Sequence, residues 1–235
     1  MRASLKQALV SGFFGLACLQ TVSAMEVVTN GGFETGSLNG WSVVNLGDGG
    51  CGTNAWTVNS IGGHGCSNNV GNMTAPTNGT FAVYNTFDGP AGTLQISQQL
   101  TLPKSLASAT LSFFDTVRIV WPISSPRIFS IDLYDATNTT LLYNLYSQSF
   151  HNVDQEWVSH IVDVTNGLLD NADQTVTLRV SNFIPENFTG PAGFGIDDIS
   201  LNITSSEVPE PGSLALVGVA LAGLAASRRK QKSQA

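Results

Sequence analysis

Positive charge is scarce in this 235-residue sequence, which has 10 lysines and arginines against 17 aspartates and glutamates. Six of the ten basic residues lie near the two ends, so that residues 25–207 hold four basic and 16 acidic residues and a formal charge of −12. Nucleic acids and anionic lipid surfaces are bound through clustered cations. The central part of the chain is therefore expected to bind neither, whereas its charge is compatible with cations and neutral glycans as ligands.

The sequence also lacks the common catalytic motifs. A Gly-x-Ser-x-Gly nucleophile turn, a His-Glu-x-x-His zinc pair and a phosphate-binding glycine loop do not occur. His151 and His160 flank a turn that contains Asp154 and Glu156, without forming a recognisable triad motif. A carboxylate pair could serve a glycoside hydrolase, but its spacing across a fold cannot be read from a sequence. We expect no catalytic residues and no enzymatic activity.

Cysteine is rare, with three residues in the chain. Cys51 and Cys66 flank a glycine-rich loop and are expected to form a disulfide, because residues 1–24 have the order of a secretory signal peptide, as detailed below, and exported cysteines are usually oxidised. Closing a loop of about 15 residues would contribute roughly 3 kcal/mol to stability. The alternative is a metal site shared with His64, but two cysteines and one histidine make an incomplete structural zinc set.

The N-terminus has the order of a secretory signal peptide. Arg2 and Lys6 precede an apolar stretch, which ends in the small residues Val22-Ser23-Ala24. We therefore expect residues 1–24 to be removed on export. A lipoprotein signal ending at Cys18 is the alternative, but the residues before this cysteine fit such a signal less well than residues 22–24 fit ordinary cleavage.

The C-terminal tail predicts a short transmembrane helix. Residues 214–226 are wholly apolar and are followed by four cations within residues 228–232. With its flanking residues, such a helix would reach about 25 Å, against about 30 Å for a bilayer core. A buried core helix would need a polar face, which this run lacks. Clustered cations stay in the cytoplasm, so residues 227–235 are expected there and the body of the protein outside.

Three features of this tail occur in a fixed order: Pro209-Glu210-Pro211, the apolar run, and a basic cluster that begins with Arg228 and Arg229. The arrangement resembles the PEP-CTERM sorting signal of Gram-negative bacteria. The resemblance implies an inner-membrane intermediate, recognition by an exosortase-type processing enzyme, and delivery to the cell surface or extracellular matrix. It covers only the tail, and it indicates where the protein goes rather than what it does.

Residues 25–204 are expected to form one all-β domain, joined to the membrane helix by a linker over residues 205–213. The segment is long enough for one sizeable core and short for two. It is rich in Gly, Asn, Ser and Thr, and it has no amphipathic helical stretch of useful length. Alternating apolar residues and β-branched runs predict strands near 80–87, 94–102, 111–119, 129–133, 142–146, 157–165, 174–180 and 193–201.

The start of this domain reads Asn-Gly-x-Phe-Glu at residues 30–34 and is followed by Gly40-Trp41. Together with the three last predicted strands, this order resembles galactose-binding-like jelly-roll domains, which include many carbohydrate-binding modules. The resemblance implies two packed antiparallel sheets, which agrees with the alternation of apolar residues. Phe33 and Trp41 are then expected in the core.

The same resemblance implies a structural calcium ion that joins the first strand region to the last. The matching carboxylates are Glu34 and one of Asp197 and Asp198. Calcium takes six to eight oxygen ligands, so backbone carbonyls and Asn30 would have to complete the set. We therefore name Asn30, Glu34 and Asp198 as candidate metal ligands. The alternative is that Glu34 caps a turn and the two aspartates face water.

Carbohydrate binding is the favoured function of the domain, because sugar rings stack on exposed aromatic side chains. The candidate stacking residues are Trp56, close to the predicted disulfide loop, and Trp121, in a segment with two prolines. A core position is the alternative for Trp121, since tryptophan is highly buried on average. A structural matrix protein without a specific ligand is the second hypothesis, and the sequence does not separate it from a protein that binds exopolysaccharide.

Overall fold

The computed structural model describes residues 24–45, 56–62, 73–119 and 122–205, all of which belong to one compact unit, Ser23–Glu207. Along these stretches no helix is long and apolar enough to cross a membrane. Several predicted features lie outside the described residues, namely residues 1–23 of the signal peptide, the Cys51–Cys66 disulfide, Trp121, and the linker, membrane helix and basic tail after residue 205.

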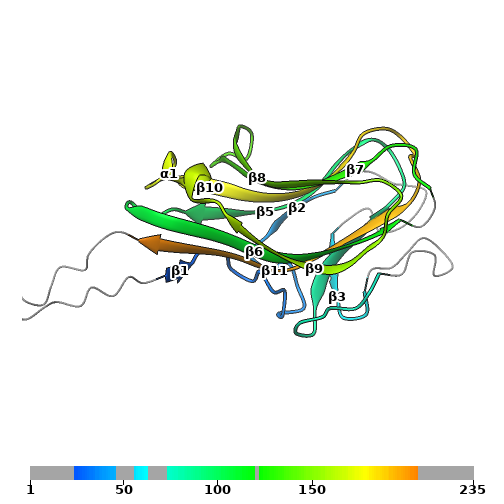
Figure 1. The fold of residues 1–235 in the computed structure, drawn as a ribbon, viewed down its shortest axis with the longest axis horizontal. Coiled ribbons are helices and arrows are strands. Elements are labelled where there is room, and N and C mark those ends of the chain that lie inside the picture. Colours follow the sequence, from blue (N-terminus) through cyan, green and yellow to red (C-terminus); the bar gives the residue numbers. More distant parts are fainter. Residues whose placement is uncertain (1–23, 46–55, 63–72, 120–121, 206–235) are drawn as a thin grey trace, which may run out of the picture. The chain divides into compact units, whose positions relative to one another are not determined.

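Eleven strands of the described chain form two antiparallel sheets, which Figure 1 shows as two layers. The six-stranded sheet has the order β3-β4-β11-β6-β9, and β1 also pairs with β11. Its strands are β1 (Ala24–Glu26), β3 (Thr57–Asn59), β4 (Ala82–Phe87), β6 (Leu106–Ile119), β9 (Gln155–Asp163) and β11 (Ala192–Ser205).

The five-stranded sheet has the order β2-β5-β10-β7-β8. Its strands are β2 (Ser42–Val44), β5 (Gly92–Thr101), β7 (Arg127–Asp135), β8 (Leu141–Phe150) and β10 (Thr175–Ile184). One short helix, α1 (Thr165–Leu169), joins β9 to the segment before β10. The expected all-β sandwich of two antiparallel sheets is confirmed, and each of the eight predicted strands corresponds to one of the strands β4 to β11.

One hydrophobic core lies between the sheets, because alternate residues of the longer strands point inward. Phe113 of β6 packs against Phe129 of β7, and Phe129 packs against Phe194 of β11, with ring centroids 6.1 and 6.2 Å apart. Each fully buried phenylalanine contributes roughly 1.5–3 kcal/mol. Phe33 and Trp41 belong to the same core, as expected, and are 0% and 7% exposed.

Strand β11 changes partners along one of its edges. It pairs with β4 through residues 192–196 and with β1 through residues 202–204, and its register with β6 is irregular between Asp197 and Ser200. The loop after β1 approaches this irregularity, where Ile199 N–H donates to Gly31 O at 3.0 Å. The first and last parts of the domain therefore meet at the irregular segment of β11.

Candidate functional site

Glu34 is held against the turn that precedes β4. Its carboxylate accepts hydrogen bonds from Thr80 N–H at 2.9 and 3.0 Å and from Phe81 N–H at 2.9 Å. Gly79 has a φ of +64°, and a Cβ there would lie 2.3 Å from Glu34 Oε1. Only glycine therefore allows the turn to approach the carboxylate this closely.

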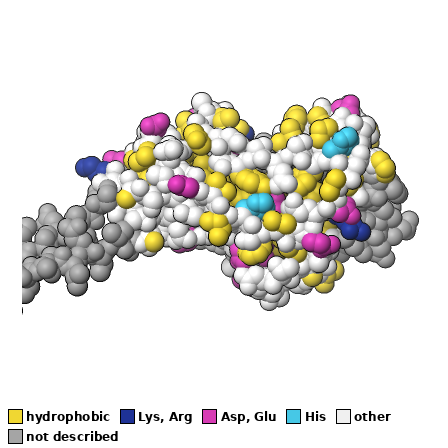
Figure 2. Space-filling model, in the orientation of Figure 1, with side chains coloured by type: hydrophobic (Ala, Val, Ile, Leu, Met, Phe, Trp, Pro, Cys, Tyr) yellow, Lys and Arg dark blue, Asp and Glu magenta, His cyan; other side chains and the backbone are white. Residues whose placement is uncertain are grey.

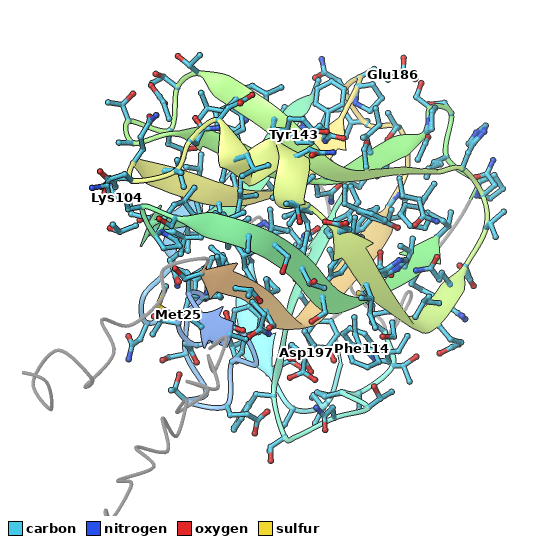
Figure 3. All side chains as sticks on the ribbon, turned by 60° about the vertical axis from the view of Figure 1, so that its left-hand side comes forward. Met25, Lys104, Phe114, Tyr143, Glu186 and Asp197 are labelled. Carbon is cyan, nitrogen blue, oxygen red and sulfur yellow. The ribbon has the colours of Figure 1, made fainter. Side chains whose placement is uncertain are left out.

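Asp197 and Asp198 occupy the irregular segment of β11. Asp198 has a φ of +50°, and its Oδ2 accepts a hydrogen bond from Asn78 Nδ2 at 2.5 Å. Asp198 N–H donates to Asp197 Oδ1 at 2.8 Å. Asp197 is 3% exposed and lies beside Phe114, its partner on β6 (Figure 3). The turn over residues 78–81 thus connects Glu34 and Asp198, which are distant in the sequence. We call Glu34, Asp197 and Asp198 the carboxylate cluster.

The carboxylate cluster concentrates negative charge in a partly buried place. The pKa of Asp197 is raised to about 7, mainly by burial; the hydrogen bond from Asp198 N–H opposes the rise, and the charges of Asp198 and Glu34 add to it. Burial also raises the pKa of the Tyr84 phenol, with a smaller contribution from the charge of Asp197. A divalent cation would relieve this repulsion, and carboxylates with backbone and amide oxygens are the ligands that calcium prefers.

The side chain of Asn30 makes hydrogen bonds within its own loop, and its role as a calcium ligand stays a prediction. Its amide Nδ2 donates to the carbonyls of Ser37 and Asn39 at 2.9 and 3.0 Å, and its Oδ1 accepts from the hydroxyl of Thr35 at 3.1 Å. Its carbonyl accepts from the indole Nε1 of Trp41 at 3.1 Å. Asn30 thus organises the loop that carries Glu34. In the described part of the chain, no three His, Cys, Asp or Glu side chains are arranged to hold a metal, so a calcium shell there needs backbone or amide oxygens.

Trp56 is a core residue, and its interpretation as a stacking platform for sugars is wrong. Its side chain is 2% exposed and belongs to the core between the sheets. A buried indole has no free face on which a sugar ring could stack. The second candidate, Trp121, lies outside the described residues and stays a prediction.

The middle of the outer surface of the five-stranded sheet is mostly polar. We call it the polar face, and define it as the side chains of this sheet that point away from the core. One row crosses all five strands through the register of neighbouring residues, and a second row lies next to it. The first row is Ser42, Ser97, Arg179, Asp132 and Asn144, and the second is Val44, Gln95, Ser181, Ser130 and Ser147.

Several polar groups of this face are buried although they point away from the core. Ser97, Asp132 and Ser181 are between 4% and 7% exposed. Ser181 Oγ and Arg179 Nε are buried without a hydrogen-bond partner among the described residues. Each such atom costs about 1–3 kcal/mol when it stays unpaired, so a ligand hydroxyl or carboxylate that reached it would recover this cost.

A cavity of about 470 Å³ lies over one part of the polar face. Ser97 and Thr177 lie on its sheet side, Gly40 comes from the loop before β2, and Ala136 and Asn138 come from the loop between β7 and β8. That loop is tied to β5, because Gln99 Nε2 donates to Ala136 O at 2.8 Å. The face also carries aromatic rings: Phe183 of β10 is 40% exposed, and Tyr134 lies under Arg179.

The loop between β7 and β8 depends on the ionised carboxylate of Asp135. Hydrogen bonds from Thr140 N–H, Thr139 N–H and the Thr137 hydroxyl lower the pKa of Asp135 to about 2. This stabilisation is present above the unfolded pKa of about 4 and is lost as the pH falls toward 2. We expect Asp135→Asn to lower the melting temperature at pH 6. Melting curves from pH 6 to 2 should show the difference from the parent protein shrink below about pH 4. A difference independent of pH would contradict this.

The two described histidines make contacts within the sandwich. His160 Nε2 lies 2.9 Å from Asp115 Oδ1, and its ring stacks on Phe113 at a centroid distance of 4.7 Å. Burial raises the pKa of Asp115, and its hydrogen bond with His160 opposes the rise. His151 Nε2 lies 3.0 Å from the carbonyl of Ile123. Among the described residues, neither histidine side chain forms a hydrogen bond with a serine or cysteine that could act as a nucleophile.

Residues 207–230 match the PEP-CTERM protein-sorting motif. The chain therefore carries this motif at its C-terminal end, as the sequence indicated, and the motif marks an exported protein that is processed at the cell envelope. A search of curated proteins gave no sequence match.

Solved structures with a similar fold come from several kinds of protein. A cyclase from Fischerella sp. TAU matches 79% of this chain and 100% of its own, with a TM-score of 0.50 and 16% identity. TmCBM61, solved with β-1,4-galactotriose, matches 75% of this chain and 97% of its own, with a TM-score of 0.42 and 18% identity. The K3 adhesin domain of Lys-gingipain from Porphyromonas gingivalis W83 matches 77% of this chain and 100% of its own, with a TM-score of 0.47 and 18% identity. At 16% identity the similarity to the cyclase shows the fold alone.

Proposed function

We propose that this protein is a non-catalytic, exported protein of the surface or extracellular matrix of a Gram-negative bacterium, and that its sandwich binds a polysaccharide on the polar face. In this proposal the helix over residues 214–226 anchors an inner-membrane intermediate. An exosortase-type enzyme then recognises the segment around Pro209-Glu210-Pro211. The match of residues 207–230 to the sorting motif supports this route.

The observation that carries the binding proposal is the composition of the polar face. Protein surfaces that bind sugars combine hydrogen-bonding groups for the hydroxyls with aromatic rings for the apolar faces of the sugar. Here two rows of mostly polar side chains lie between Tyr134 and the exposed ring of Phe183. The cavity beside them, bounded by Gly40 and Asn138, is of a size that suits a small ligand or a short part of a chain.

Affinity electrophoresis through gels that contain different polysaccharides tests the binding proposal. We expect at least one gel to retard the purified protein, and Phe183→Ala to weaken the retardation about tenfold, which corresponds to roughly 1.4 kcal/mol. Ile161→Ala is the matched control, because Ile161 is 77% exposed on the other sheet and its loss should leave the mobility unchanged. Unchanged mobility in every gel, from a protein that melts cooperatively, would instead favour a structural matrix protein without a specific ligand.

We further propose that Glu34 and Asp198 hold a structural calcium ion. The support for this is the proximity of both carboxylates to the turn over residues 78–81, and the charge that they place next to Asp197. Carbonyl oxygens of the adjoining loops would complete the shell, and Asn30 would act by shaping the loop before Glu34. An ion here would hold the first loop of the domain against the irregular segment of β11.

A further inference from the structure

Arg179 lies near the centre of the polar face with its plane fixed by an aromatic ring. Its Cζ is 3.2 Å from the centroid of the Tyr134 ring on the neighbouring strand. A guanidinium that stacks on a ring keeps its N–H groups at the edge, where they can form a pair of parallel hydrogen bonds. The side chain is therefore presented in a defined orientation on the face.

The hydrogen-bond donors of Arg179 are largely unused. A guanidinium has five N–H donors, but within the described residues that of Arg179 makes one side-chain hydrogen bond, from Nη1 to Asn138 Oδ1 at 3.5 Å, which is long. Arg179 Nε is buried without a partner. Two ion pairs occur among the described residues, Arg118–Asp154 and His160–Asp115, and neither includes Arg179. No described carboxylate oxygen therefore lies within 4.0 Å of a guanidinium nitrogen of Arg179. Burial lowers the pKa of Arg179, and the negative charge of Asp132 partly opposes this.

The nearest acidic neighbour in the register is already satisfied by neutral donors. Asp132 lies opposite Arg179 on β7, and its Oδ2 accepts from the Ser130 hydroxyl at 2.6 Å. Its Oδ1 accepts from Asn144 Nδ2 at 2.6 Å. The carboxylate on the face accepts two short hydrogen bonds, whereas the guanidinium has one long hydrogen bond, a stacking contact with Tyr134 and only the more distant charge of Asp132. This asymmetry indicates that an anionic acceptor from outside the chain belongs beside Arg179.

We propose that the glycan bound on the polar face carries a carboxylate, as a uronic acid does, and that this group forms a bidentate pair with Arg179. The inference rests on the function proposed above and specifies its ligand. A planar carboxylate matches the fork of a guanidinium, and Ser181 Oγ on the same strand is free to bond a neighbouring hydroxyl.

The surrounding charge restricts this ligand to widely spaced acidic groups. Asp132 lies next to the single cation of the two rows, and residues 25–207 have a formal charge of −12. Figure 2 likewise shows many acidic and few basic side chains on the face of the molecule that it draws. A polymer that is charged at every sugar would be repelled. The ligand is therefore a glycan with one acidic sugar among neutral ones.

Isothermal titration with three probes at constant calcium concentration tests the inference. The probes are a polysaccharide with one glucuronic acid in each repeat, the same polysaccharide after reduction of its carboxyl groups to alcohols, and a sulfated neutral polysaccharide. We expect the intact protein to bind the carboxylated form at least about tenfold more tightly than the reduced and sulfated forms, and we expect this preference to fall with added salt.

Three variants test whether the preference for the carboxylated polysaccharide depends on Arg179. Arg179→Gln should bind the carboxylated and reduced forms equally, and Arg179→Lys should keep only part of the preference because it loses the fork. Arg118→Gln is the matched control: it removes the same charge from an exposed residue that pairs with Asp154, and the preference should remain. Melting curves establish that each variant is folded.

Equal binding of the carboxylated and reduced forms by the intact protein would overturn the inference and leave glycan binding standing. So would a preference that Arg179→Gln retains, or an equal preference for the sulfated form. If none of the three probes binds and no neutral polysaccharide does, the proposed function itself fails. Binding of both forms that is lost together in folded Arg179→Gln would assign the residue a general positioning role and overturn its pairing with a carboxylate.

Discussion

Calcium at one hundred times its dissociation constant is expected to stabilise the folded protein by about 2.7 kcal/mol, because an ion that binds only the native state adds its binding free energy to folding. For a domain of this size the melting temperature should rise by about 8 °C. The expected cause is the carboxylate cluster, in which burial and two neighbouring charges raise the pKa of Asp197 to about 7. Differential scanning calorimetry with added calcium or with a chelator measures the shift.

Two substitutions and a control connect this shift to the cluster. Asp198→Asn and Glu34→Gln should each remove most of the calcium-dependent rise, because each takes one charge from the proposed ion. Without calcium, Asp198→Asn should melt no lower than the parent protein, since it relieves repulsion. Asp170→Asn removes an exposed carboxylate at the end of α1 and should leave the calcium effect intact. A parent protein that melts at the same temperature with calcium and with chelator would refute the metal site.

The strands were predictable because burial on one face gives a two-residue period that can be seen in the sequence. Alternation around Leu111 and Phe113, for example, corresponds to residues of β6 that are 0% and 1% exposed. The short strands β1, β2 and β3 escaped prediction. Each has three residues with no buried alternate positions, so that their pairing depends on the neighbouring long strands.

The carboxylate cluster was predictable only in part. Glu34 and Asp198 followed from the resemblance to jelly-roll domains, and the structure connects them through the turn over residues 78–81. Asn78 and Gly79 were missed, because a turn between two strands has no periodic signal that shows which carboxylates it will approach. The hydrogen bonds of Asn30 to its own loop likewise depend on a backbone path that the motif does not specify.

The polar face was missed because its rows depend on register. The predicted strand at residues 174–180 includes Arg179 at an outward position, but which residues lie beside it depends on how five strands align. Phe183 lies beyond the end of that predicted strand. Trp56 was misjudged because its place near a glycine-rich loop suggested exposure, whereas the first residues of β3 bring it against the core.

Replacing Gly31 by alanine is expected to destabilise the protein by at least about 3 kcal/mol, which exceeds the usual cost of overpacking because the clash is with backbone. A Cβ at this position would lie 1.8 Å from the carbonyl oxygen of Ile199, within the hydrogen-bonded contact that Ile199 N–H makes with Gly31 O. The first loop would have to move away from β11. Urea denaturation of the parent and variant proteins measures the change.

The clash at Gly31 is with backbone atoms, whereas the corresponding clash at Gly167 is with a side chain that can move. A Cβ at Gly167 would lie 2.5 Å from the ring of Tyr143, but that ring is 45% exposed and can rotate away. Alanine also favours the helical conformation of α1 by about 1 kcal/mol over glycine. Gly167→Ala should therefore cost little or stabilise slightly, although its Cβ contact of 2.5 Å is also too short to be tolerated without movement. Because the Gly31 contact joins the loop that carries Glu34 to the segment of β11 that carries Asp198, Gly31→Ala should also weaken calcium binding. A variant that loses neither stability nor calcium affinity would show that the first loop is not fixed against β11.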